Sequence, residues 1–74
     1  MMNVKIVATF QGRGKPSEDV SGLIRTQPPY VAQDYVLLQH EDYAAKYQIL
    51  LSEPNLEAGT WKLHLRLEEV MQPI

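Results

Sequence analysis

The sequence predicts a mainly β fold, a single small antiparallel β-barrel or sandwich of about five strands. Residues 60–67 alternate without a break between polar and apolar side chains, which is the pattern of a strand with one face in a core. Residues 3–10 alternate in a similar way and are rich in β-branched side chains. Segments of turn-forming residues at 11–19, 27–29 and 52–59 separate the apolar runs, as expected of short strands joined by loops.

The first half of the chain contains two expected strands. Residues 3–10 form the first, and the glycine-rich, charged segment 11–19 is an exposed loop because it has nothing to bury. Residues 20–26 form a second strand, in which Gly22 marks a bulge or a close approach of another backbone segment. Pro28 and Pro29 then end the strand, since proline supplies no ladder donor.

Residues 34–51 allow two interpretations. As strands, residues 34–40 and 46–52 are apolar runs joined by a polar turn. As a helix, residues 34–51 place Val36, His40, Tyr43, Tyr47 and Leu50 on one stripe, which gives an α+β fold with one helix on a three-stranded antiparallel sheet. We favour strands, because the ends of the segment are rich in β-forming residues and the helical stripe leaves several leucines on other faces.

The last strand covers residues 60–70, after a turn around Pro54 and Gly59. Alternation then predicts which side chains form the core. The expected core residues are Val4, Ile6, Ala8, Phe10, Ile24, Val36, Leu38, Ile49, Leu51, Trp61, Leu63, Leu65 and Leu67.

Length and composition restrict the class of protein. Seventy-four residues with 45% apolar side chains are enough for one small globular domain, residues 1–74. The chain has no cysteine, so disulfides and thiolate metal sites are excluded and a reducing, cytoplasmic location is expected. No run of 18 apolar residues and no signal-like amino terminus occur, so neither a membrane nor export is expected.

The central part of the chain is rich in tyrosine, a residue that offers large contact area at low entropic cost. We expect an interaction surface formed by Tyr30, Tyr35, Tyr43 and Tyr47. The predicted function is therefore that of a non-enzymatic protein–protein interaction module, a small accessory, regulatory or assembly-component protein that docks another protein through a β-edge or this surface. A homodimer is a further prediction, because small domains gain stability by oligomerising.

The alternative function is binding of single-stranded nucleic acid. The polar face of the last strand carries Lys62, His64 and Arg66 in line, and Arg13 and Lys15 lie in the glycine-containing loop. Basic groups in a row are what a phosphate backbone requires. Against this function, Trp61 falls on the opposite, core-facing side, and Glu68 extends the basic row with negative charge.

No enzyme, metal or cofactor is expected. His40 and His64 are the two histidines, and their spacing matches no metal-binding motif. The serines lie outside any nucleophile-elbow pattern, and the carboxylates are scattered along loops and the last strand.

Overall fold

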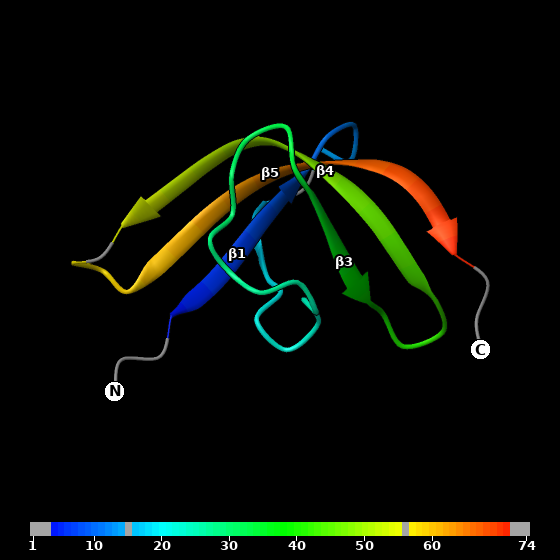
Figure 1. Cartoon of the computed structure of the whole chain (residues 1–74), viewed down its shortest axis with the longest axis horizontal. Helices are drawn as coiled ribbons and strands as arrows, with labels where there is room; N and C mark the ends of the chain where they lie inside the picture. The colour runs from blue at the N-terminus through cyan, green and yellow to red at the C-terminus, as the bar shows by residue number, and fades with distance from the viewer. Residues whose placement is uncertain (1–3, 15, 56, 72–74) are drawn as a thin grey trace.

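The computed structural model describes residues 4–14, 16–55 and 57–71, which form a five-stranded sheet. The strands are β1 (Lys5–Phe10), β2 (Glu18–Asp19), β3 (Tyr35–Gln39), β4 (Ala44–Asn55) and β5 (Thr60–Met71). Their order across the sheet is β2-β1-β5-β4-β3, and the sheet curls into an open half-barrel (Figure 1). The prediction of a mainly β fold with five strands is confirmed, whereas the sheet is neither a closed barrel nor a sandwich.

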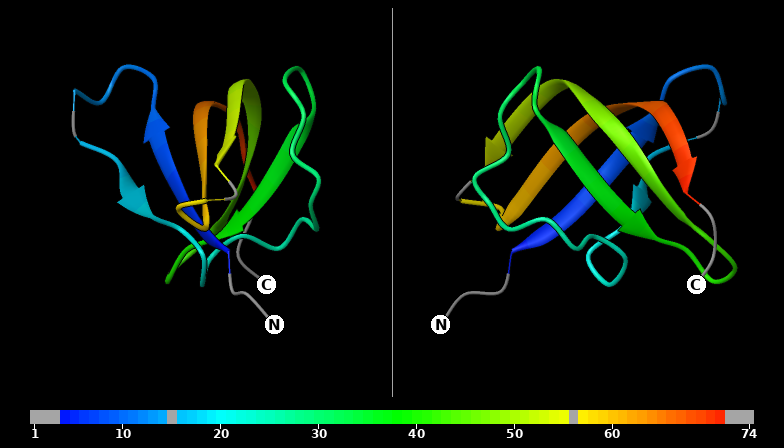
Figure 2. Two further views of the ribbon diagram at one scale, coloured as in Figure 1. Left: turned by 90° about the vertical axis from the view of Figure 1, so that its left-hand side faces the viewer. Right: turned by 45° about the vertical axis from the view of Figure 1, so that its right-hand side comes forward.

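One pairing differs from the expected antiparallel arrangement. The pairs β1–β2, β3–β4 and β4–β5 are antiparallel, but β1 runs parallel to β5 from Lys5↔Thr60 to Phe10↔Leu65. Parallel neighbours need a long connection, and here the chain between β2 and β3 runs from one edge of the sheet to the other (Figure 2). The prediction of a purely antiparallel sheet is therefore wrong, because alternation reveals faces and not strand order.

Residues 34–51 form strands and not a helix. β3 and β4 pair over Tyr35↔Gln48 to Gln39↔Ala44, and the turn between them closes where the His40 N–H donates to the Tyr43 carbonyl at 2.8 Å. β4 is longer than predicted and continues through Pro54 to Asn55. Among the described residues there is no helix, and thus none long and apolar enough to cross a membrane.

The predicted strand at 20–26 is wrong. The second strand is only the pair Glu18–Asp19, and the next residues form turns in which the Leu23 and Ile24 N–H groups donate to the Val20 carbonyl at 3.0 Å. Val20 is fully buried and Ile24 makes one isolated bridge to Leu38. The segment therefore covers the core. Its apolar residues alternate because some of them are buried, although the segment does not pair as a strand of the sheet.

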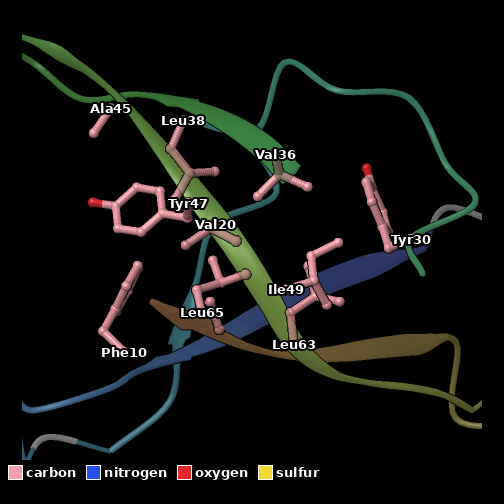
Figure 3. Close-up of a cluster of buried hydrophobic side chains, with 11 residues drawn as sticks. Phe10, Val20, Tyr30, Val36, Leu38, Ala45, Tyr47, Ile49, Leu63 and Leu65 are labelled. Atoms are coloured by element: carbon pink, nitrogen blue, oxygen red, sulfur yellow. The ribbon is translucent and has the colours of Figure 1, made fainter. Parts of the chain in front are cut away.

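The core fills the concave side of the sheet (Figure 3). Seven predicted core residues are buried: Ala8, Phe10, Val36, Leu38, Ile49, Leu63 and Leu65. Ile6, Ile24 and Trp61 are partly buried and pack against them. Four further buried residues were not predicted as core: Val20, Tyr30, Ala45 and Tyr47.

Three predicted core residues are exposed, and the sheet explains the two that lie within strands. Val4 precedes β1 and is 43% exposed. Leu51 follows a register shift between Ile49 and Leu51, and such a bulge reverses the alternation so that Ser52, and not Leu51, lies opposite the buried Leu63. Leu67 remains on the concave face but lies beyond the end of β1, which pairs only as far as Leu65. Burial of that face therefore stops where its neighbouring strand stops.

Candidate functional site

The four tyrosines do not form one surface. Tyr30 is 4% exposed and Tyr47 1% exposed, and both rings belong to the core (Figure 3). Tyr43 is half-buried beside His40, while Tyr35 is exposed on β3 with the Lys46 ammonium 4.5 Å from its ring centroid. Two of the four residues predicted for the tyrosine-rich interaction surface, Tyr30 and Tyr47, therefore lie in the core, since tyrosine buries its ring readily where its hydroxyl finds a partner.

The hydroxyl partners of these buried rings explain their position. The Tyr30 hydroxyl donates to the Thr26 carbonyl at 2.8 Å. The Tyr47 hydroxyl lies 3.0 Å from His40 Nε2, and the ring of Tyr47 packs on Phe10 with centroids 5.2 Å apart. Burial raises the pKa of both tyrosines above the usual value.

A small polar cluster surrounds the Tyr47 hydroxyl and is formed by His40, Tyr43, Tyr47, Arg13 and Glu18. The His40 ring stacks on Tyr43 with centroids 4.6 Å apart. Burial lowers the pKa of His40, the nearby Arg13 guanidinium lowers this pKa further, and Glu18 opposes the shift. Arg13 itself lies 4.7 Å from the Phe10 ring centroid and 4.0 Å from the Glu18 carboxylate.

The basic row predicted for nucleic acid is exposed, and its member Arg66 is ion-paired. Lys62, His64 and Arg66 lie on the convex face of β5. Arg66 donates to Gln48 and forms a 2.9 Å ion pair with Glu68, while Glu53 lies opposite Lys62.

The predicted loop contribution does not join this row. The Arg13 side chain packs on Phe10, a core residue of the opposite, concave face, and Lys15 lies outside the described residues. Tyr35 is the exposed aromatic residue two strands away, and its ring is covered by Lys46. The described convex face therefore does not place an exposed aromatic ring beside the basic row, as stacking of single-stranded bases requires.

The most distinctive surface feature is the unpaired edge of β5. β1 pairs with β5 only up to Leu65, where the Gln11 N–H donates to the Leu65 carbonyl at 2.8 Å. β5 continues to Met71, and over residues 66–71 the described chain pairs with it only on the β4 side. In Figure 1 the end of β5 extends well past the tip of β1. We call residues 66–71 of β5 the open edge.

The hydrogen bond from the Gln11 N–H to the Leu65 carbonyl shows which backbone groups of β5 point toward the open side. Backbone groups of a strand alternate between its two sides, so Leu67 presents its N–H and C=O to the same side as Leu65. Leu67 pairs with the buried Tyr47, and after a register shift Val70 pairs with the buried Ala45, so both side chains share the concave face of the core. Leu67 is 49% exposed and Val70 56%. The open edge therefore combines unpaired backbone groups with an apolar shelf.

Sequence reasoning assigned Leu67 to the core and left Val70 without a role. One signal was available: Glu68 and Glu69 interrupt the alternation, and a doubled polar residue in an otherwise alternating strand is consistent with a bulge. The end of pairing at Leu65 had no local signal, because it depends on where a strand distant in sequence ends.

A second concave feature lies at the opposite end of the β4–β5 hairpin. It is an open hollow of about 450 Å³ lined by Glu53, Pro54, Asn55, Glu57, Thr60 and Lys62. Most of these side chains are exposed, so the hollow offers little of the desolvation that substrate binding needs. Among the described residues, no three His, Cys, Asp or Glu side chains are grouped to hold a metal ion.

Comparison with family models, with curated proteins and with solved structures finds no match for this chain.

Proposed function

We propose that this protein is a non-enzymatic protein–protein interaction module that binds an extended segment of a partner protein along the open edge of β5. The observation that carries the proposal is the pairing of β5, which ends at Leu65 on one side and at Met71 on the other. Unpaired strand edges form backbone hydrogen bonds to added strands, and pockets for alternate side chains give specificity. Here Leu67 and Val70 supply the apolar contacts.

The other edges of the sheet are less suited to this role. β2 is two residues long and consists of acidic side chains, which protects a strand edge from pairing. The outer side of β3 is occupied by residues 23–25: the Arg25 N–H donates to the Leu37 carbonyl, and the Gln39 N–H donates to the Leu23 carbonyl, both at 2.9 Å. The open edge of β5 is therefore a better place for strand addition than the edges at β2 and β3.

A second copy of this chain is disfavoured in the register that places the apolar side chains Leu67 and Val70 of the two copies opposite each other. If two open edges paired antiparallel with Leu67 opposite the second copy's Val70, then Glu68 would lie opposite the second copy's Glu69. Like charges directly opposite each other destabilise a strand pair. Homodimerisation through another surface stays a prediction. The absence of cysteine is compatible with a reducing compartment, and we propose a cytoplasmic location.

Selection from a phage-displayed library of random octapeptides tests this function. We expect selected peptides to bind the intact chain and to lose at least about tenfold in affinity, equivalent to about 1.4 kcal/mol, in Leu67→Pro. Proline at this position removes a donor on the open side and no hydrogen bond to β4. Leu67→Lys blocks the same edge and keeps the ladder, so it serves if the proline variant fails to fold.

Leu51→Lys is the matched control, because Leu51 is 47% exposed in β4 and faces away from the core. Binding that survives both Leu67 variants, binding that Leu51→Lys abolishes to the same extent, or a selection that yields no binding peptide would contradict the proposal.

A further inference from the structure

We infer that the partner segment is cationic, with lysine or arginine alternating with apolar residues. This inference rests on the proposed function, because it specifies the chemistry of the segment that pairs with the open edge. The apolar residues of such a segment would lie over Leu67 and Val70, and the cations would lie on the convex face of the sheet.

The charges around the open edge are predominantly acidic. Glu68 and Glu69 lie on the open edge itself, and both are exposed. The pairing of Ala44 with Met71 brings the β3–β4 turn, which carries Glu41 and Asp42, beside the end of β5. Two carboxylates therefore lie on the open edge itself, and two more lie in the turn on the β4 side of the end of β5.

The two neighbouring cations do not offset this charge fully. Arg66 is held by Glu68 at 2.9 Å and by Gln48. Lys46 lies opposite Glu69, and its ammonium rests 4.5 Å from the Tyr35 ring centroid. Over the end of β5 and the adjoining turn together, two carboxylates thus remain in excess, and this field favours a basic partner over an acidic one.

The concave side of the open edge has a different character. Arg13 and Glu18 lie near Tyr47, the β4 residue that pairs with Leu67, and because these two groups are 4.0 Å apart they have little net charge. Together with the exposed Leu67 and Val70, this side favours apolar residues of the partner. A partner strand of alternating cationic and apolar residues would place its cations on the acidic convex side and its apolar residues on the concave side, because strand side chains alternate with period two.

Three acetylated and amidated peptides test the inference, built from three Lys-Val, three Thr-Val or three Glu-Val repeats. Fluorescence anisotropy with the full chain should give the tightest binding for the Lys-Val peptide and the weakest for the Glu-Val peptide. We expect a difference of roughly tenfold or more, as two or three cross-strand charge pairs provide. The difference should shrink at about 0.5 M salt, where the Debye length is only a few ångströms.

Glu69→Gln should reduce the preference for the Lys-Val peptide, whereas Glu57→Gln, in the turn at the opposite end of the hairpin, should leave it unchanged. Equal binding of all three peptides at an edge that Leu67→Pro blocks overturns the cationic partner and leaves the proposed function intact. Stronger binding of the Glu-Val peptide overturns it too. If none of the peptides binds, or if Leu67→Pro binds all of them unchanged, strand addition itself is refuted.

Discussion

Truncation of two leucines on the same face of β5 tests how much a neighbouring strand adds to the stability that an inward-facing side chain provides. Leu65 and Leu67 both point to the concave side, but Leu65 is fully buried between Ile49 of β4 and Phe10 of β1, whereas Leu67 is 49% exposed. We compare Leu65→Ala with Leu67→Ala. The chemical change is identical, so any difference reports the missing neighbour.

The magnitudes follow from burial. Leu65→Ala removes transfer energy and leaves a cavity in a filled core, which costs about 2–5 kcal/mol of the free energy of unfolding. Full burial of a leucine contributes about 1.5–3 kcal/mol. With about half of its surface in water and no cavity to leave behind, Leu67 should contribute roughly half of this, or about 1 kcal/mol.

Urea unfolding followed by the fluorescence of Trp61, the chain's single tryptophan, measures both values. Trp61 packs against the core and its indole N–H donates to Ser52 at 2.6 Å, so its emission reports loss of the native packing. Leu65→Val provides a milder truncation if Leu65→Ala does not fold. Equal losses for the two alanine variants would refute the reasoning, because they would mean that Leu67 is covered as fully as Leu65.

Two further perturbations test side chains on the concave side of the half-barrel. Because the pKa of His40 is lowered in the folded chain, the unfolded chain takes up a proton first as the pH falls, and the stability should be complete above about pH 6.5 and decrease below it. Urea midpoints measured over this pH range should show the decrease. His40→Gln should remove the decrease, and His64→Gln is the exposed control. Ser52→Ala removes a hydroxyl that accepts from Trp61 and donates to the Tyr30 carbonyl, both at 2.6 Å, and should cost about 1–3 kcal/mol and shift the Trp61 emission. An unchanged emission spectrum and urea midpoint would contradict this role for Ser52.

The sequence contains enough information for the strands and for most of the core. Alternation in residues 3–10 and 60–67 predicts which face of each strand is apolar, and Ala8, Phe10, Leu63 and Leu65 are buried as this predicts. This information is local, since it requires only the period of a strand. The expected strands at 34–40 and 46–52 also correspond to β3 and β4, although β4 extends further in both directions.

Two kinds of information are not local. The order of the strands depends on how the chain crosses the molecule, so the parallel pair of β1 and β5 had no signature in either strand. The bulge after Ile49 also depends on pairing, and it exposes Leu51 while it directs Ser52 toward Leu63, Trp61 and Tyr30. The candidate site was predicted only as a class, a β-edge, because its position is set by the end of a neighbouring strand.

A turn directly after Gln11 ends β1, and the residues of this turn therefore determine where the open edge of β5 begins. After Gln11 donates to Leu65, the chain leaves the sheet in a turn in which Arg13 donates to the Phe10 carbonyl at 3.3 Å. Gly12 adopts a φ of 84° there, in the left-handed region that glycine enters without steric cost. With a β-branched residue at this position, an extended conformation would be favoured and β1 could continue beside Leu67 and Val70. Gly12 therefore directs the chain away from β5, so that the described residues place no strand on that side of residues 66–71, where we propose that the partner segment pairs.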